Sequence, residues 1–434
     1  MRIIRNKLLV DLKNESNEYL LVNILFGLVD VITKNEALLI KKWDNNNELT
    51  IPENDDERAF FQALVQRKYI MDANAENNIR QNIITSLKKH PQQLLTDSKS
   101  ASFIFSYNCN FACPYCYEKS RTYNNDIMSI DMIDKVFSLY SKGLQHIGLF
   151  GGEPLLPENQ LLIEYIIKKA PSAFYTVITN GYYLDMYLDL FKKIKIAMIQ
   201  ITLDGDKDAH NKTRKLKDGT PTFDKILENI DLCIASNLPL KIRMNISEQN
   251  KESCFNLRKR LKEKFGTKYL NFEMQPLFNY SYEKQATFYK DMLKNDKDIG
   301  AKNVIFHTLP RLSNFLFNHS PLSPMIRFCE SESQNRFYDC YGDIYSCILS
   351  VGEKNKKIGS FYPQLKLKEN SLLSYDITAN PQCIECNLAL LCGGGCPYYT
   401  MDNEGKIQKA NCANIKNEID NIIPILYKER FEKQ

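Results

Sequence analysis

The stretch that decides the fold is ASFIFSYNCNFACPYC, residues 101–116, in which an apolar run leads directly into three cysteines. The run SFIFSY has the length and apolar content of a buried strand. Cys109, Cys113 and Cys116 follow it, separated by three and then two residues. The sequence therefore places three thiols in the loop after the first strand of a domain.

Apolar runs of this kind alternate with helical patterns from Ala101 to about Phe278. Six of them are expected to be strands: SFIFSY, IGLFGG, FYTVITN, AMIQITLD, LKIRMNIS and YLNFEMQPLF. Helical segments between successive strands require parallel pairing with right-handed crossovers. We predict an α/β fold over residues 99–280, a partial (β/α)6 barrel or an open parallel sheet, whose site lies at the C-terminal ends of the strands.

Polar side chains follow four successive strands and suit one common site. The turn Gly151-Gly152-Glu153-Pro154 joins two glycines, which allow close backbone approach, to a carboxylate. The next two strand ends supply hydroxyl, amide and carboxylate groups. The candidate cofactor-binding residues are Tyr115, Gly151, Gly152, Glu153, Pro154, Thr179, Asn180, Thr202, Asp204 and Arg214. Each is a polar turn alone, but together they form a coherent site.

Three clustered thiolates can hold three irons of a four-iron cluster and leave the fourth iron open for a ligand. A zinc site or three unrelated thiols is the alternative. With GGEP and the strand-end motifs in order, the CxxxCxxC loop resembles the radical S-adenosylmethionine (SAM) superfamily over Ala101 to Phe278. The resemblance implies that SAM binds the open iron and is cleaved reductively to a 5′-deoxyadenosyl radical, which abstracts a substrate hydrogen atom.

A second cysteine set begins at Cys329. Twelve residues separate Cys329 from Gly342, and four more separate Gly342 from Cys347. Its spacing is similar to that of the SPASM domain, which we predict over residues 329–434. The resemblance implies an auxiliary four-iron cluster on one set of four ligands, Cys383, Cys386, Cys392 and Cys412. It implies a second auxiliary cluster on Cys329, Cys347 and Cys396. A zinc ribbon is the alternative, because CxxC and CxxxC also suit tetrahedral zinc.

Cys340 is open to two interpretations. It either completes the second auxiliary ligand set or is a free thiol, in which case an iron stays open for a substrate sulfur. Asp339 and Asp343 flank the same loop and, with Cys340, are the candidate catalytic groups, although loop aspartates commonly only form turns. Cys233 and Cys254 lie in helical patterns and are expected to be structural.

The first 98 residues read as strands followed by helices. Strands are expected over Lys7 to Leu12 and Tyr19 to Ile32, with a turn near Gly27, and helices in EALLIKKW, DERAFFQALVQRKYI and ENNIRQNIITSLKKH. This winged-helix-like unit resembles the precursor-recognition (RRE-like) domain of peptide maturases, in which a leader segment adds a strand to an exposed sheet edge. A simple capping domain is the alternative. Residues 281–328 are expected to be a linker.

The resemblance as a whole implies a peptide maturase that installs a thioether or carbon–carbon crosslink in a ribosomally made precursor. Its cofactors would be three [4Fe-4S] clusters and SAM, and its partners a precursor peptide with a leader and an electron donor such as flavodoxin or ferredoxin. Sulfatase-maturase-like oxidation is an alternative, but Ile348 stands where those enzymes carry an aspartate base. A non-catalytic iron–sulfur or zinc protein is the other.

Bulk composition excludes several classes. The 57 basic and 52 acidic residues are spread along the chain, which does not indicate nucleic-acid binding. The sequence contains no run of 18 apolar residues, so no membrane-spanning helix is predicted. Thirteen cysteines are an odd number and argue against a closed set of disulfides. We therefore expect a cytoplasmic protein.

Overall fold

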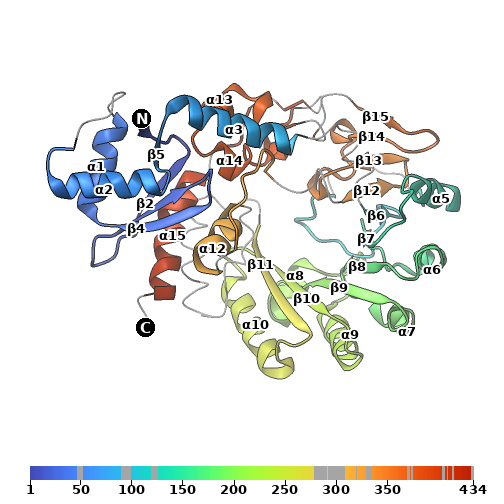
Figure 1. Ribbon diagram of the computed structural model, residues 1–434. Helices are drawn as coiled ribbons and strands as arrows, with labels where there is room; N and C mark the ends of the chain where they lie inside the picture. The colour runs from blue at the N-terminus through green and yellow to red at the C-terminus, as the bar shows by residue number, and fades with distance from the viewer. Residues whose placement is uncertain are drawn as a thin grey trace.

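The computed structural model describes residues 1–45, 52–88, 99–118, 126–277, 291, 308–318, 320–328, 335–368, 372, 375–402, 406–407, 409–412 and 415–431. Figure 1 shows an N-terminal unit, a barrel-like sheet with helices on its outer side, and a C-terminal part that contacts both.

The six predicted strands form a parallel sheet in chain order. They are β6 (Ser100–Ile104), β7 (His146–Phe150), β8 (Phe174–Thr179), β9 (Lys195–Thr202), β10 (Leu240–Ile246) and β11 (Leu270–Pro276). The helices between them are α5 (Ile130–Ser138), α6 (Gln160–Lys169), α7 (Leu188–Phe191), α8 (Lys207–Thr213), α9 (Phe223–Ala235) and α10 (Lys251–Phe265). The prediction of a partial (β/α)6 barrel is confirmed.

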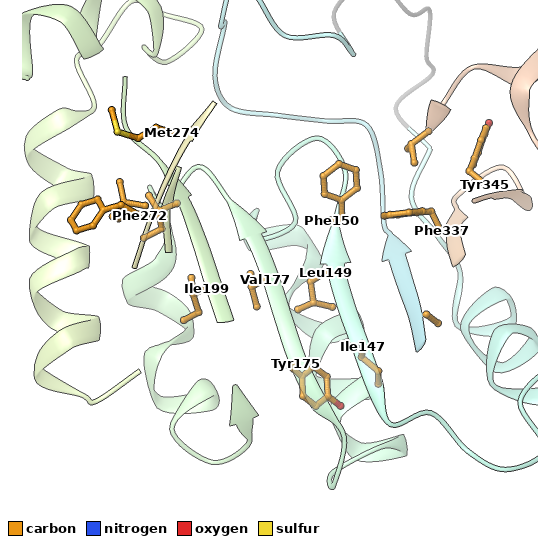
Figure 2. Packing of buried hydrophobic residues seen from close by; sticks show 14 of the residues in the cluster. Ile147, Leu149, Phe150, Tyr175, Val177, Ile199, Phe272, Met274, Phe337 and Tyr345 are labelled. Carbon is orange, nitrogen blue, oxygen red and sulfur yellow. The ribbon is translucent and has the colours of Figure 1, made fainter. Parts of the chain in front are cut away.

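Apolar side chains of alternate strand residues hold this sheet to its helices. Ile147 and Leu149 of β7 and Tyr175 and Val177 of β8 are at most 1% exposed, and Figure 2 shows them packed together. Residues two apart share one face of a strand, so this is one continuous apolar layer. Burying a side chain of this size contributes about 1.5–3 kcal/mol, which fixes the register that aligns the strand ends.

The sheet extends beyond β6 into the C-terminal part, which the sequence did not predict. β12 (Arg336–Asp339) pairs parallel with β6, and Asp339 lies opposite Ile104. Three antiparallel strands follow, β13 (Asp343–Tyr345), β14 (Gly359–Ser360) and β15 (Lys366–Leu367). A buried hydrogen bond of 2.8 Å between the hydroxyls of Tyr140 and Tyr338 links β12 to the segment after α5. The β12–β13 hairpin therefore lies next to the cysteine loop.

The N-terminal unit matches the predicted element order. β2 (Lys7–Asp11), β3 (Tyr19–Asn23) and β4 (Leu28–Ile32) form an antiparallel sheet, with Gly27 at φ +61° in the expected turn. The helices are α1 (Lys34–Asn45), α2 (Asp55–Gln66) and α3 (Ala73–Leu87). The helix expected through Ile70 ends earlier, because Lys68 adopts φ +57° and β5 (Ile70–Met71) pairs with β1 (Arg2–Ile3).

The C-terminal part consists of short elements. They are α12 (Thr308–Asn318), α13 (Pro381–Ile384), α14 (Ala389–Cys392), α15 (Ile415–Phe431) and single helical turns at Ile348–Ser350, Lys354–Lys356, Ile377–Ala379 and Pro397–Thr400. Two further such turns, Pro157–Asn159 and Leu184–Tyr187, belong to the barrel. Helix α12 packs against α15, and α15 against β2. Among the described residues, no helix has the length and apolar character needed to cross a bilayer.

Candidate functional site

The loop after β6 holds the three predicted thiols in a fixed backbone. The backbone N–H of Phe111 donates to Cys109 Sγ at 3.4 Å, and the N–H of Cys116 donates to the carbonyl of Cys113 at 3.3 Å. The N–H of Ala112 donates to the carbonyl of Lys215. Burial raises the pKa of the Cys109 thiol to about 12. Its thiolate therefore needs a cation such as a metal to form at neutral pH.

Glu153 of the GGEP turn joins the ends of β7 and β8. Its side chain is 1% exposed and accepts hydrogen bonds from Thr179 Oγ1 at 2.6 Å, Asn180 N at 2.7 Å and Leu155 N at 2.9 Å. Burial raises the pKa of this carboxyl, and the three hydrogen bonds oppose that rise. A carboxylate accepts about four hydrogen bonds, so one position remains for a donor such as an ammonium group.

The two glycines before Glu153 are needed for the close approach that the sequence predicted. Gly151 and Gly152 have positive φ angles of +88° and +35°. A Cβ added to Gly152 would lie 2.1 Å from the carbonyl oxygen of Asn108, and that same oxygen accepts a 2.7 Å hydrogen bond from Glu153 N. The GGEP turn is therefore attached directly to the cysteine loop. Pro154, the last residue of this turn, is buried.

Asn180 attaches the end of β8 to the same loop. Its Nδ2 donates to Asn110 Oδ1 at 2.7 Å and lies 3.9 Å from Cys109 Sγ. Sequence reasoning missed Asn110, although it lies between two of the predicted cysteines. Its own Nδ2 is buried without a hydrogen-bond partner among the described residues. Such an unpaired donor is costly unless a ligand accepts its hydrogen bond.

Tyr115, Asp204 and Arg214 form a buried network at the end of β9. The Tyr115 hydroxyl donates to Asp204, and Arg214 Nη1 donates to Tyr115 at 2.9 Å. Burial raises the pKa of Asp204, and the nearby Arg214 charge opposes the rise. Arg214 Nε is buried without a hydrogen-bond partner among the described residues. It is therefore a second donor without an acceptor in the described part of the chain.

Thr202 and His210 differ in their roles. Thr202 ends β9, is 9% exposed and lies opposite Arg243 of β10. His210 is buried, accepts from Asp204 N at 3.3 Å and contacts Thr222 Oγ1 at 3.2 Å. Burial, with a smaller effect of Arg214, lowers the pKa of His210 well below its ordinary value. This neutral histidine supports the strand end.

The donor set of this site fits an amino-acid head group beside a metal. Asn110 and Arg214 offer unpaired N–H donors that suit a carboxylate, and Glu153 keeps one acceptor position that suits an ammonium. The three thiols are soft ligands of the kind that hold iron–sulfur clusters. The residues present therefore fit both SAM and a cluster with an open iron.

Comparison with known proteins agrees with this chemistry. Residues 103–261 match the model of the Radical SAM superfamily. A GTP 3',8-cyclase of Rhizobium etli is 30% identical over 32% of the chain, and the chain spans only 40% of that relative's length. A cysteine-type anaerobic sulfatase-maturating enzyme of Clostridium novyi is 24% identical over 76% of the chain and 92% of its own length.

Two solved structures share the fold. The structure of anSMEcpe with bound AdoMet and a peptide aligns with 77% of the present chain and with 99% of the anSMEcpe chain. Its TM-score is 0.55 and its sequence identity 19%. The structure of SuiB of Streptococcus suis, bound to S-adenosylmethionine, aligns with 94% of the present chain and with 99% of the SuiB chain. Its TM-score is 0.56 and its sequence identity 16%.

Residues 103–261 are a radical SAM domain. That domain implies one [4Fe-4S] cluster and SAM as cofactors. Within this class the chain is related to sulfatase-maturating enzymes, and its fold is shared with SuiB.

The four thiols predicted for one auxiliary cluster lie together. Cys386 and Cys412 are near enough to raise the pKa of Cys383, and all three raise that of Cys392, in each case after the effect of burial. The N–H groups of Leu388 and Gly394 donate to Cys386 and Cys392 at 3.4 and 3.3 Å. Such N–H···S bonds are typical around iron–sulfur clusters.

The remaining predicted ligands are less completely described. Cys347 and Cys396 are half-buried, and Cys329 lies outside the described residues. Within the part of the chain that the structure describes, no group of three or more His, Cys, Asp or Glu side chains is arranged so that it could hold one metal ion.

The candidate catalytic residues shape the β12–β13 hairpin. Asp339 accepts hydrogen bonds from the Tyr107 hydroxyl at 2.8 Å and from two backbone N–H groups, and burial raises its pKa to about 6. Asp343 pairs with Lys357 at 2.6 Å. Cys340 is 6% exposed, and burial and the neighbouring carboxylates raise its pKa to about 12. Tyr107, which the sequence reasoning missed, connects this hairpin to the cysteine loop.

We expect Glu153→Gln to weaken SAM binding about 10- to 150-fold. The variant removes the charge that an ammonium would face and one acceptor of a buried hydrogen bond, a loss of about 1.5–3 kcal/mol. Anaerobic calorimetry of SAM binding to the reconstituted protein measures it. Glu158→Gln, at an exposed position five residues later, is the control and should bind normally. Equal affinities for both variants would contradict the assignment of Glu153.

Proposed function

We propose that the chain is a peptide maturase that crosslinks a ribosomally made precursor through a thioether or carbon–carbon bond. The observation that carries the proposal is a small N-terminal sheet whose edge strand β4 pairs with no further strand among the described residues, in one chain with a radical SAM domain and a cysteine-rich C-terminal part. The precursor peptide would be the substrate, and its leader segment would bind the free edge.

The coverage of the two structural neighbours supports an N-terminal recognition unit. anSMEcpe covers 77% of the chain, whereas SuiB covers 94%. Residues 1–98 are about a quarter of the chain, which is close in size to the share that anSMEcpe leaves uncovered. SuiB has also been crystallised with its precursor peptide SuiA. Both neighbours therefore have structures with a peptide, which supports a peptide partner here.

The backbone of β4 offers hydrogen bonds to an added strand. Leu12 N bonds Glu18 O and Ile24 N bonds Asn6 O, so the even-numbered residues of β3 face β2 and its odd-numbered residues face β4. By the β3–β4 register, Leu28, Asp30 and Ile32 then face β3, and the N–H and C=O groups of Val29 and Val31 point outward. The Val29 carbonyl accepts a hydrogen bond from Arg67 Nη2 at 3.2 Å, so Val31 is the position for strand pairing. Val31 is 46% exposed. An extended leader could pair there.

We expect Val31→Pro to weaken leader binding about tenfold or more, because proline removes an outward N–H and crowds the incoming strand. The fold should persist, since proline is tolerated on edge strands where the N–H faces solvent. Fluorescence anisotropy with a labelled leader of the short peptide encoded beside the gene measures binding. Val31→Ala keeps the N–H and is the control. Unchanged binding by the proline variant would exclude this edge.

We propose three [4Fe-4S] clusters in total. Cys109, Cys113 and Cys116 hold one, and Cys383, Cys386, Cys392 and Cys412 hold the second. Cys329, Cys347 and Cys396 contribute to the third. Cys340 would either complete this third ligand set or leave one of its irons open.

Iron and sulfide analysis of the reconstituted chain should give about twelve irons, four for each cluster. Cys386→Ala should lose about four of them, while Cys233→Ala, in the buried face of α9, should lose none. Zinc in place of iron, or the same iron content in all three proteins, would refute the cluster assignment.

The reaction balances as an oxidation of the peptide. SAM and the clusters, when bound, supply the hydrogen-abstracting radical and accept the second electron. The chain's own residues hold the reactants: Glu153 and Arg214 would orient the SAM head group, and the hairpin at Asp339 borders the loop that carries the first cluster. An electron donor such as flavodoxin or ferredoxin would supply reducing equivalents.

Reduced, reconstituted enzyme with SAM should convert the neighbouring precursor peptide into a product about two mass units lighter, because bond formation removes two hydrogens. Mass spectrometry with fragmentation measures this and locates the bond. A protein with Cys109, Cys113 and Cys116 all changed to alanine is the control. Full SAM turnover with unchanged peptide mass would argue against crosslinking.

Sulfatase maturation is a second candidate, favoured by the match over 92% of the Clostridium novyi enzyme. Ile348 begins a short helical turn directly after Cys347, where those enzymes carry a base. A cysteine-containing sulfatase peptide, incubated in parallel with the precursor, separates the two. Modification of the sulfatase peptide alone would favour this candidate.

A further inference from the structure

The N-terminal unit contacts the loop that carries two of the proposed auxiliary-cluster ligands. Arg5 donates to the carbonyl of Glu385 and pairs with its carboxylate at 2.8 Å. Asn6 Nδ2 donates to the carbonyl of Asn387 at 3.0 Å. Arg80 Nη2 donates to the carbonyl of Cys383 at 3.3 Å. Three N-terminal side chains therefore orient the segment that carries Cys383 and Cys386, and Figure 1 shows α3 running beside α13.

Arg80 differs from Arg5 because its side chain is buried and forms no direct ion pair among the described residues. Its side chain, on α3, is 7% exposed, and among the described residues no carboxylate lies within 4.0 Å of it. Glu76, one helical turn earlier, is engaged by Arg2 and by the N–H groups of Arg5 and Asn6. A buried unpaired cation is costly. The negative groups that favour its charge are, in order of effect, the Glu385 carboxylate, the Cys386 thiol and Glu76.

Tyr375 provides a second buried donor at the same thiols. Its side chain is 6% exposed, and its hydroxyl has no hydrogen-bond partner among the described residues. Asn380 lies beside it, but the amide oxygen of Asn380 already accepts from Gln382 N at 3.0 Å. A Cβ on Gly394 would lie 3.0 Å from the Tyr375 hydroxyl and 3.6 Å from Cys383 Sγ. The Tyr375 hydroxyl therefore lies where the thiols gather and has no acceptor for its proton among the described residues.

We propose that Arg80 and Tyr375 are positioning residues of the auxiliary cluster held by Cys383, Cys386, Cys392 and Cys412, and that they raise its reduction potential. A reduced cluster carries one more negative charge than an oxidised one. A buried cation and a hydrogen-bond donor stabilise that charge, and hydrogen bonds, net charge and burial are what set such potentials. The N-terminal unit is then part of the redox site as well as a recognition unit.

This inference rests on the proposed cluster but not on the peptide reaction. The test uses the full chain with Cys109, Cys113 and Cys116 changed to alanine, so that only the two auxiliary clusters contribute to the spectra. Redox titration followed by electron paramagnetic resonance gives their midpoint potentials without peptide or SAM. Failure of peptide crosslinking would therefore leave this measurement intact, whereas absence of iron at the four cysteines would remove its premise and the proposed cluster together.

In this background, Arg80→Gln should shift one auxiliary midpoint potential to a more negative value and leave the other unchanged. Arg80→Lys, which keeps the cation, should restore most of it. Arg58→Gln removes an exposed arginine of α2 that pairs with Asp55, and should shift neither potential. Iron content is measured for each variant, so that a potential is compared only between fully loaded proteins.

Tyr375→Phe removes one oxygen and should shift the same potential in the same direction. If Arg80→Gln fails to load iron, the potential of the Tyr375→Phe variant becomes the test of the proposal. Unchanged potentials in fully loaded Arg80→Gln, or in Tyr375→Phe where Arg80→Gln does not load, would overturn the proposal. Equal shifts in Arg80→Gln and Arg80→Lys would also overturn it, because they would reflect lost packing rather than lost charge.

Discussion

The hydrogen bonds of the Glu153 carboxylate are the interaction on which the site depends. They join the end of β7 to Thr179 and Asn180 at the end of β8, and Asn180 in turn bonds the loop of the first three cysteines. A buried carboxylate must be satisfied this way or lose its charge. Its remaining acceptor position is therefore held in place before any ligand arrives, which is what a preorganised binding site requires.

The barrel strands, the GGEP turn and the four-thiol group could be predicted because each depends on residues that are close together in the sequence. The six strands of the barrel follow from apolar runs separated by helical patterns, and the glycines of the GGEP turn from their place after a strand. The four-thiol group was predicted through a familiar spacing. In each case the residues that carry the signal are close together in the sequence.

The features that the sequence did not reveal involve distant segments. β12 has four residues, too few for a clear pattern, and its place beside β6 depends on more than 230 intervening residues. Asn110 was overlooked because an isolated asparagine between cysteines gives no signal of its own. Arg80 reads as an ordinary polar position of a helix, and only the fold brings it to the carbonyl of Cys383.

The same contacts give the N-terminal unit two roles in this account. In the proposed function its outer edge at Val31 pairs with a peptide, while Arg5, Asn6 and Arg80 hold the loop of Cys383 and Cys386. Peptide binding and cluster electrostatics then lie on different surfaces of one small unit.

We propose that the loop of Cys109, Cys113 and Cys116, with the adjoining strand ends, binds the cluster at which SAM is cleaved. Liquid chromatography of the reconstituted, dithionite-reduced protein with SAM tests this proposal. We expect 5′-deoxyadenosine and methionine, both lost when the three cysteines are alanine. Iron-loaded protein that binds SAM but forms no 5′-deoxyadenosine under strong reductant would contradict it.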